Sequence, residues 1–214
     1  MFEPARNTDA DPAIDTYARL SQQITERGPW QQTATGNAFF LGDPSAGEVD
    51  PIAVASSLGR LCRYNGHLKF DVYHYSVAQH ATNIARWMRE DGHDTDACFY
   101  GLHHDSAEAY TGDIISQVKQ LVPEFRLLED AVERAVLWRM GIGPAYAVEM
   151  KPLIKRYDFL ALATEVRDLL PPNQTRYTWG DLPEPRKEHI IPVDSRQATV
   201  DFLAMHRELG GTYV

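Results

Sequence analysis

The 214-residue sequence predicts an all-α helical bundle with one compact core and a small irregular or β-hairpin N-terminal part. Two observations favour this class. Apolar residues recur at helical spacing through most of the chain after residue 75, and glycine or proline ends several of these periodic segments. The chain contains no internal repeat and no low-complexity tract. We therefore expect a mostly helical fold built around one core.

The N-terminal part has weaker periodicity than the rest. The pattern predicts a polar start over residues 1–12 and an amphipathic helix over 11–28, which Gly28-Pro29 ends. Residues 30–50 are rich in Thr, Gly, Phe and Pro, and they predict a short strand or hairpin followed by a loop.

The helices predicted from residue 50 onward follow capping residues and apolar stripes. Asp50-Pro51 is a typical helix start, Ser76 is a typical N-cap, and the dipeptide Asn65-Gly66 marks a loop between them. The expected helices cover 51–62, a segment that begins after Ser76, 95–110, 123–140, one or two helices within 145–170, and 195–209. The segment 173–192 is expected to be a loop.

Composition and charge exclude several classes of protein. The formal net charge is −9, which argues against a partner such as duplex nucleic acid, because that partner requires a basic surface. The two cysteines form no CxxC pair, and neither a disulfide framework nor a zinc ribbon is indicated. The acidic N-terminus and the lack of a membrane-length apolar run predict a cytoplasmic protein without a membrane partner.

Histidines and carboxylates gather inside an otherwise apolar helical pattern. The stretch HHDSAEAYTGD, residues 103–113, contains His104, Asp105 and Glu108. Buried carboxylates are costly without a cation, and divalent metals favour imidazole combined with carboxylate. Glu108 follows His104 by four residues and Asp105 by three, so a continuous helix would place it on their face. The further candidate ligands are His80 and Asp158.

The pattern H…HD…D, formed by His80, His104-Asp105 and Asp158, resembles the signature of the HD superfamily of metal-dependent phosphohydrolases. The strings RYNGH, YSVAQHA and HDSAEAYTGDIISQVKQLVP are similar to the branch that contains bacterial 5′-deoxynucleotidases and phage dATP triphosphohydrolases. The resemblance implies an HD-domain helical bundle with its catalytic domain over 30–170. An arm with one helix would precede it over 1–29, and a loop and C-terminal helix over 171–214 would pack on it.

Carried over residue by residue, the resemblance implies roles for nine residues. The ligands of a divalent ion (Zn, Co, Mn or Mg) would be His80, His104, Asp105 and Asp158. Glu108 would be the acid/base that orients or deprotonates the attacking water. The substrate contacts would be Arg63 and Lys119 at the phosphates, where they also assist catalysis, and Tyr64 at the sugar or base. Asp113 would either meet the sugar 3′-hydroxyl or hold the active-site loop.

The implied activity is release of phosphate from deoxynucleoside 5′-monophosphates, by a protein that forms a homo-oligomer. Two alternatives stay open: a triphosphohydrolase that converts dATP to deoxyadenosine and triphosphate, and a non-catalytic nucleotide-binding regulatory protein. Other members of the superfamily keep two further histidines between the HD pair and the last aspartate. This chain has none between Asp105 and Asp158, so the resemblance implies a mononuclear site with four ligands. Glu165 is interpreted as part of a solvated helix face and His206 as a surface residue.

Overall fold

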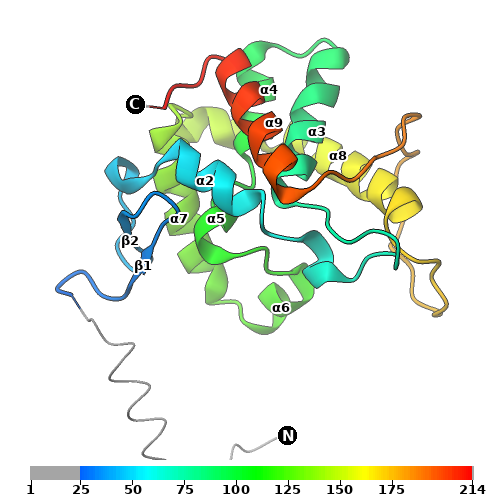
Figure 1. The fold of residues 1–214 in the computed structure, drawn as a ribbon, viewed down its shortest axis with the longest axis horizontal. Coiled ribbons are helices and arrows are strands. Elements are labelled where there is room, and N and C mark those ends of the chain that lie inside the picture. The colour runs from blue at the N-terminus through cyan, green and yellow to red at the C-terminus, as the bar shows by residue number, and fades with distance from the viewer. Residues whose placement is uncertain (1–24, 214) are drawn as a thin grey trace, which may run out of the picture.

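The computed structural model describes residues 25–213, which form a mostly helical protein with a two-stranded hairpin, as predicted (Figure 1). Strands β1 (Trp30–Gln32) and β2 (Ala38–Phe40) pair in antiparallel register. The helices are α2 (Pro51–Leu58), α3 (Val77–Glu90), α4 (Thr95–His103), α5 (Glu108–Thr111), α6 (Ser116–Leu121), α7 (Phe125–Arg139), α8 (Pro144–Asp168) and α9 (Ser195–Glu208). Short 3₁₀ turns are η1 (Ala46–Glu48) and η2 (Arg63–Gly66). Most of the helix predicted over 11–28 lies outside the described residues, and residues 25–28 form a turn.

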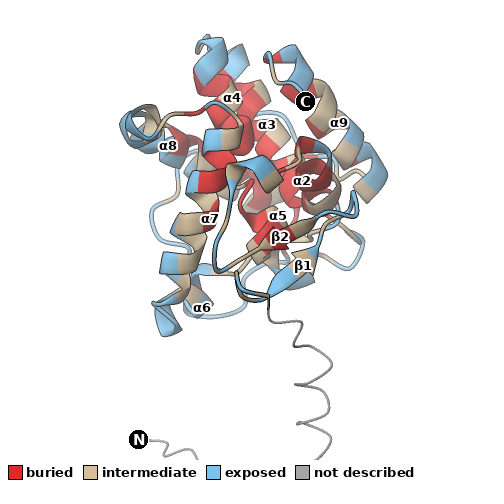
Figure 2. Cartoon of the chain, turned by 90° about the vertical axis from the view of Figure 1, so that its left-hand side faces the viewer, coloured by how far each residue is buried: buried red, intermediate tan, exposed pale blue. Residues whose placement is uncertain are grey.

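Helix α3 lies at the centre of the core because α4, α8, α9 and α2 all contact it. Its predicted apolar face is confirmed: Val77, Ile84 and Met88 are completely buried, and Trp87 is almost completely buried. Figure 2 shows buried positions on the inward faces of α2, α3 and α4, while much of α6 is exposed. His80 belongs to this central helix and is fully buried, so its ring nitrogens require partners within the protein or a bound ligand.

The predicted helix starts at Asp50 and Ser76 are confirmed. The Asp50 carboxylate accepts a hydrogen bond from the backbone N–H of Ile52 at 2.8 Å, and Ser76 Oγ accepts one from the backbone N–H of Gln79 at 3.1 Å. The sequence predicts a helix that reaches Cys62, but α2 already ends at Leu58. The backbone of Cys62 pairs instead with that of Ser76, which holds the chain extended before the 3₁₀ turn η2.

The prediction of one continuous helix over 95–110 is wrong. Helix α4 ends at His103, and the chain makes a tight turn before α5 begins at Glu108. In this turn the backbone N–H of Ser106 donates to the carbonyl of His103 at 3.1 Å, and that of Glu108 donates to Asp105 at 3.0 Å. These bonds span three residues and not four, so they tighten the backbone relative to an α-helix. We name residues 104–107 the HD turn.

Helices α6 and α8 also bear on the predicted helix pattern: α6 is not predicted, and α8 decides between one helix and two. Helix α8 is one element of 25 residues that continues through Pro152, where the sequence predicts one or two helices. Helix α6 lies where no helix is predicted, and its apolar residues Val118 and Leu121 are exposed, so they form no buried stripe that the pattern would reveal. Among residues 25–213, none of the helices is long and apolar enough to cross a membrane.

The connection between α8 and α9 has no helix or strand, as predicted, and Asp168 fastens it to the end of α8. The Asp168 carboxylate accepts hydrogen bonds from Arg167 Nε at 2.7 Å, from the backbone N–H of Ile190 at 2.8 Å and from His189 Nδ1 at 2.7 Å. Burial would raise the pKa of Asp168, but these hydrogen bonds lower it from 3.8 to about 2.

Replacing Asp168 by asparagine is expected to remove a pH-dependent part of the stability. Because its pKa is depressed in the folded state, the carboxylate stabilises the fold above about pH 4, and this contribution is lost as the pH falls toward about 2. The free energy of unfolding at neutral pH should fall by about 2 kcal/mol. Urea unfolding of wild type and Asp168→Asn across this pH range measures the difference, with the exposed Asp181→Asn as control. A difference that does not shrink in acid would contradict the assignment.

Candidate metal centre

Three predicted ligands come together where α3 passes the HD turn. One ligand atom from each of His80, His104 and Asp105 lies within 4.8 Å of the other two. Asp105 Oδ2 is 3.2 Å from His104 Nε2 and 3.6 Å from His80 Nε2. The adjacent side chains of His104 and Asp105 thus approach the same point opposite His80. The arrangement can hold a divalent ion with nitrogen and oxygen ligands.

Both imidazoles are oriented by a hydrogen bond at Nδ1. His80 Nδ1 lies 2.6 Å from Glu165 Oε1, and His104 Nδ1 donates to the carbonyl of Gly101 at 2.8 Å. A carbonyl only accepts, so His104 Nδ1 carries a hydrogen and leaves a lone pair on Nε2 when the ring is neutral. Both Nε2 atoms are buried and have no hydrogen-bond partner among the described residues. Two orphaned imidazole nitrogens beside a carboxylate fit a metal ion, and the bonds at Nδ1 are those that usually orient metal-binding histidines.

Asp158 of α8 lies next to this cluster. Its Oδ1 is 3.6 Å from His80 Nε2, while Oδ2 accepts a hydrogen bond from Lys155 Nζ at 2.9 Å. The side chain is 28 % exposed, so it stands at the solvent side of the two histidines. The structure therefore brings the fourth predicted ligand to His80, although it is not within the tightest group of three.

The charges of the cluster depend strongly on one another. Burial would raise the pKa of Asp105, but His104 and Arg63 help to hold it well below its usual range. Burial would lower the pKa of His104, but Asp105 raises it to about 9. For Glu108 burial and the charges of Asp105 and Asp113 all raise the pKa well above its usual range. Asp105 is thus ionised at neutral pH, whereas Glu108 holds its proton more tightly than an ordinary glutamate.

Comparisons with known proteins identify relatives but no activity. No family model matches the sequence. The chain is 31 % identical over 138 residues to the uncharacterized protein YfdR of Escherichia coli K12, and the alignment covers 64 % of this chain and 71 % of YfdR. The chain belongs to the YfdR family. It is also 27 % identical over 143 residues to an uncharacterized protein of Rhodobacter capsulatus, an alignment that covers 65 % of this chain and 72 % of that protein.

In this member of the YfdR family the 3₁₀ turn η2 brings two predicted substrate contacts to the cluster. The Arg63 guanidinium is mostly buried, with Nη1 at 3.6 Å from Asp105 Oδ2 and Nε at 3.5 Å from Glu165 Oε2. Tyr64 donates its hydroxyl hydrogen to Glu165. Its backbone is in the left-handed region, with φ of 58°, a conformation uncommon for residues other than glycine. Arg63 thus lies where it can meet an anion that approaches the cluster.

The remaining predicted site residues are brought near the cluster to different degrees. Glu108 Oε2 is buried without a hydrogen-bond partner in the described part of the chain. Asp113 follows α5, and burial and Asp105 raise its pKa while Arg63 lowers it. Lys119 lies on α6, but its Nζ pairs with Glu129 Oε1 at 2.6 Å. A contact between Lys119 and a phosphate would therefore have to replace or share this ion pair.

The interpretation of Glu165 as part of a solvated helix face is wrong. Its side chain is completely inaccessible and accepts hydrogen bonds from His80, from Tyr64 and from Tyr75, whose hydroxyl is 2.9 Å away. Burial would raise its pKa, but Arg63 and His80 lower it well below its usual range. The sequence does contain a signal for this role. Glu165 follows Asp158 by seven residues, two helical turns, so both carboxylates share one face of α8.

Proposed function

We propose that this protein is a metal-dependent phosphohydrolase of the HD superfamily, which releases phosphate from deoxynucleoside 5′-monophosphates. The observation that supports it most is the pair of buried, unpartnered Nε2 atoms of His80 and His104 beside Asp105. Glu108, whose pKa is raised by burial and by Asp105, and the cationic Arg63 stand next to this group. Together they combine metal ligands, a proton donor and an anion-binding side chain in one place.

The proposed ligands are His80, His104, Asp105 and Asp158. A divalent ion bound there supplies Lewis-acid chemistry, which polarises a phosphoryl oxygen and makes water a better nucleophile at neutral pH. Arg63 is placed to bind the phosphate of the substrate and to offset negative charge that develops on it. Lys119 would assist only where it gives up its pairing with Glu129.

Glu108 is the group proposed to move a proton. Burial and the neighbouring carboxylates raise its pKa, which favours the protonated form, and from that form Glu108 can deliver a proton to the 5′-oxygen of the departing nucleoside. Its backbone begins α5 directly after the HD turn, so its position is tied to that of the ligands. Asp113 and Tyr64 are proposed to contact the sugar and base side of the nucleotide.

Product analysis tests the proposal. Protein loaded separately with Mn²⁺, Co²⁺, Zn²⁺ or Mg²⁺ is incubated with dAMP or with dATP, and the products are separated by ion-exchange chromatography. Inorganic phosphate from dAMP supports the proposal. Intact triphosphate with deoxyadenosine from dATP would instead identify a triphosphohydrolase. Metal binding without product from either nucleotide would contradict both activities and favour a regulatory nucleotide-binding protein. Light scattering on the same samples tests the implied homo-oligomer.

The Glu108→Gln variant is expected to bind metal but to turn over substrate at least about 100-fold more slowly, since glutamine has the same shape and carries no transferable proton. Glu133→Gln is the matched control, because Glu133 is a half-buried glutamate whose pKa is also raised by burial, yet it is assigned no role in the reaction. Initial rates and calorimetric metal titrations are measured on both variants. Equal rates for Glu108→Gln and the control would remove Glu108 from the mechanism.

A further inference from the structure

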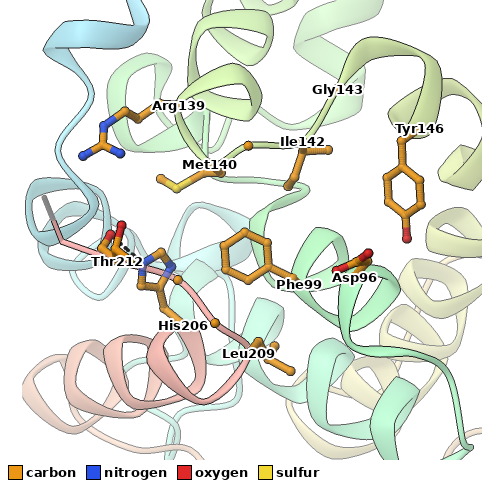
Figure 3. A pocket seen from close by; sticks show the side chains of 13 residues that line it. Asp96, Phe99, Arg139, Met140, Ile142, Gly143, Tyr146, His206, Leu209 and Thr212 are labelled. Atoms are coloured by element: carbon orange, nitrogen blue, oxygen red, sulfur yellow. Dashed lines mark hydrogen bonds between the residues drawn. The ribbon is translucent and has the colours of Figure 1, made fainter.

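A buried chain of hydrogen bonds joins the C-terminal segment to the HD turn. His206 of α9, interpreted from the sequence as a surface residue, is in fact 1 % exposed, and His103 is equally buried. His206 Nε2 lies 3.1 Å from the carbonyl oxygen of Thr212, and its Nδ1 lies 2.9 Å from His103 Nε2. His103 Nδ1 lies 2.9 Å from Ser106 Oγ, which is completely buried inside the HD turn. Figure 3 shows the first of these contacts, between His206 and Thr212.

Burial lowers the pKa of His103 and of His206, and for two neutral rings the direction of every hydrogen bond in this chain follows from its outer end. The carbonyl of Thr212 only accepts, so His206 Nε2 donates and His206 Nδ1 presents a lone pair. His103 Nε2 must then donate to that lone pair, which leaves His103 Nδ1 to accept from the Ser106 hydroxyl. Each neutral ring carries its hydrogen on Nε2. In all three bonds the donor is therefore the partner nearer to the HD turn. Reversing or breaking one of them leaves a buried polar atom unpaired.

The residues around the two histidines hold them in this geometry. The ring of His103 packs edge-on against Phe202 and Phe99, with centroid separations of 5.4 and 4.6 Å. The ring of Tyr213 stacks on His206 at 5.4 Å. Gly211 lies so close that a Cβ atom there would be 2.3 Å from His206 Cε1. The C-terminal segment thus leaves no room for a Cβ atom between Gly211 and His206.

We infer that His103 and His206 are positioning residues of the metal centre, and that docking of residues 210–213 on His206 sets the geometry of the HD turn. Ser106 directly follows Asp105, and its side chain and backbone are both bonded to His103, with its N–H donating to the His103 carbonyl at 3.1 Å. A displaced Ser106 would therefore move the neighbouring Asp105 carboxylate relative to His80. The effect on metal affinity rests on the proposed metal centre, whereas the effect on the turn itself does not.

Three variants separate positioning from general packing. His206→Phe keeps a ring and removes both hydrogen bonds. Gly211→Ala leaves both histidines in place and displaces the C-terminal segment by steric conflict. Phe202→Leu is the matched control. Phe202 lies on α9, as His206 does, and packs on the buried ring of His103, but the substitution removes no hydrogen bond. Hydrogen–deuterium exchange of residues 104–108 is measured in metal-free protein, followed by calorimetric titration with Zn²⁺ and with Mn²⁺.

In His206→Phe and Gly211→Ala we expect faster exchange in the HD turn than in Phe202→Leu, and metal dissociation constants raised about 10-fold or more, as for other partners of metal-binding residues. Exchange no faster than in the control would overturn the inference. If His206→Phe does not fold, the comparison of Gly211→Ala with Phe202→Leu decides. If the wild type binds neither metal, the proposed metal centre fails, and the exchange rates alone still decide whether the turn is positioned in this way.

Discussion

Replacing Asp105 by alanine is expected to abolish divalent metal binding and turnover. Asp105 supplies the carboxylate oxygen that lies 3.2 Å from His104 Nε2 and 3.6 Å from His80 Nε2, so it is the member of the cluster that faces both imidazoles. Changes to residues that only support a ligand cost about 10–100-fold in metal affinity, and the loss of the ligand should exceed this range. Calorimetric titration with Zn²⁺ and Mn²⁺ measures the binding, and the rate of phosphate release from dAMP measures the turnover.

The control for this prediction is Asp130→Ala, which removes an exposed aspartate of α7 and should leave both quantities unchanged. Circular dichroism verifies that Asp105→Ala is folded, because Arg63 retains Glu165 as a counter-ion when Asp105 is lost. An Asp105→Ala protein that binds metal as tightly as wild type would refute the metal centre. One that loses metal but keeps full activity would refute only the metal dependence of the reaction.

Replacing Glu165 by alanine is expected to destabilise the fold by about 3–5 kcal/mol, the usual effect of leaving a buried charge without its partner. Glu165 accepts hydrogen bonds from His80, Tyr64 and Tyr75 and lies 3.5 Å from Arg63, and none of its surface reaches solvent. Its removal leaves the Arg63 guanidinium without its closest counter-ion and His80 without the acceptor that orients its ring. Urea unfolding followed by circular dichroism measures the free energy of unfolding.

The control for Glu165 is Glu149→Ala, an exposed glutamate on the same helix, which should change stability by no more than about 0.5 kcal/mol. The double variant Glu165→Ala with Arg63→Met is expected to recover part of the loss, because it removes the unpaired charge as well. If the double variant is as unstable as the sum of the two single variants, the ion pair is not the cause. A loss below about 1 kcal/mol for Glu165→Ala would show that its burial matters little.

The elements that local signals specify were predictable from the sequence. The caps at Asp50 and Ser76 and the apolar face of α3 depend on residues within a few positions of one another, and the structure confirms them. The candidate ligands His104 and Asp105 were found because adjacent histidine and aspartate in an apolar segment are costly to bury without a cation. His80, 24 positions before His104, indeed lies opposite them.

Only the tertiary structure decided which polar groups meet across the core. Glu165 and His80 are separated by 85 positions, and His206 and His103 by 103. Helical periodicity identifies the face on which such a residue lies, but not whether that face meets solvent or another helix. The end of α4 at His103 also depends on the hydrogen bond between the His103 and Ser106 side chains, and helix propensities of single residues do not predict such a contact. The sequence by itself therefore determined the mostly helical class, the capped helix starts and the candidate ligands. The packing of α3 and its neighbours against α8 and α9 decided that Glu165, His103 and His206 support the candidate ligands. Sequence periodicity does not contain this information, because burial is a property of contacts between distant segments.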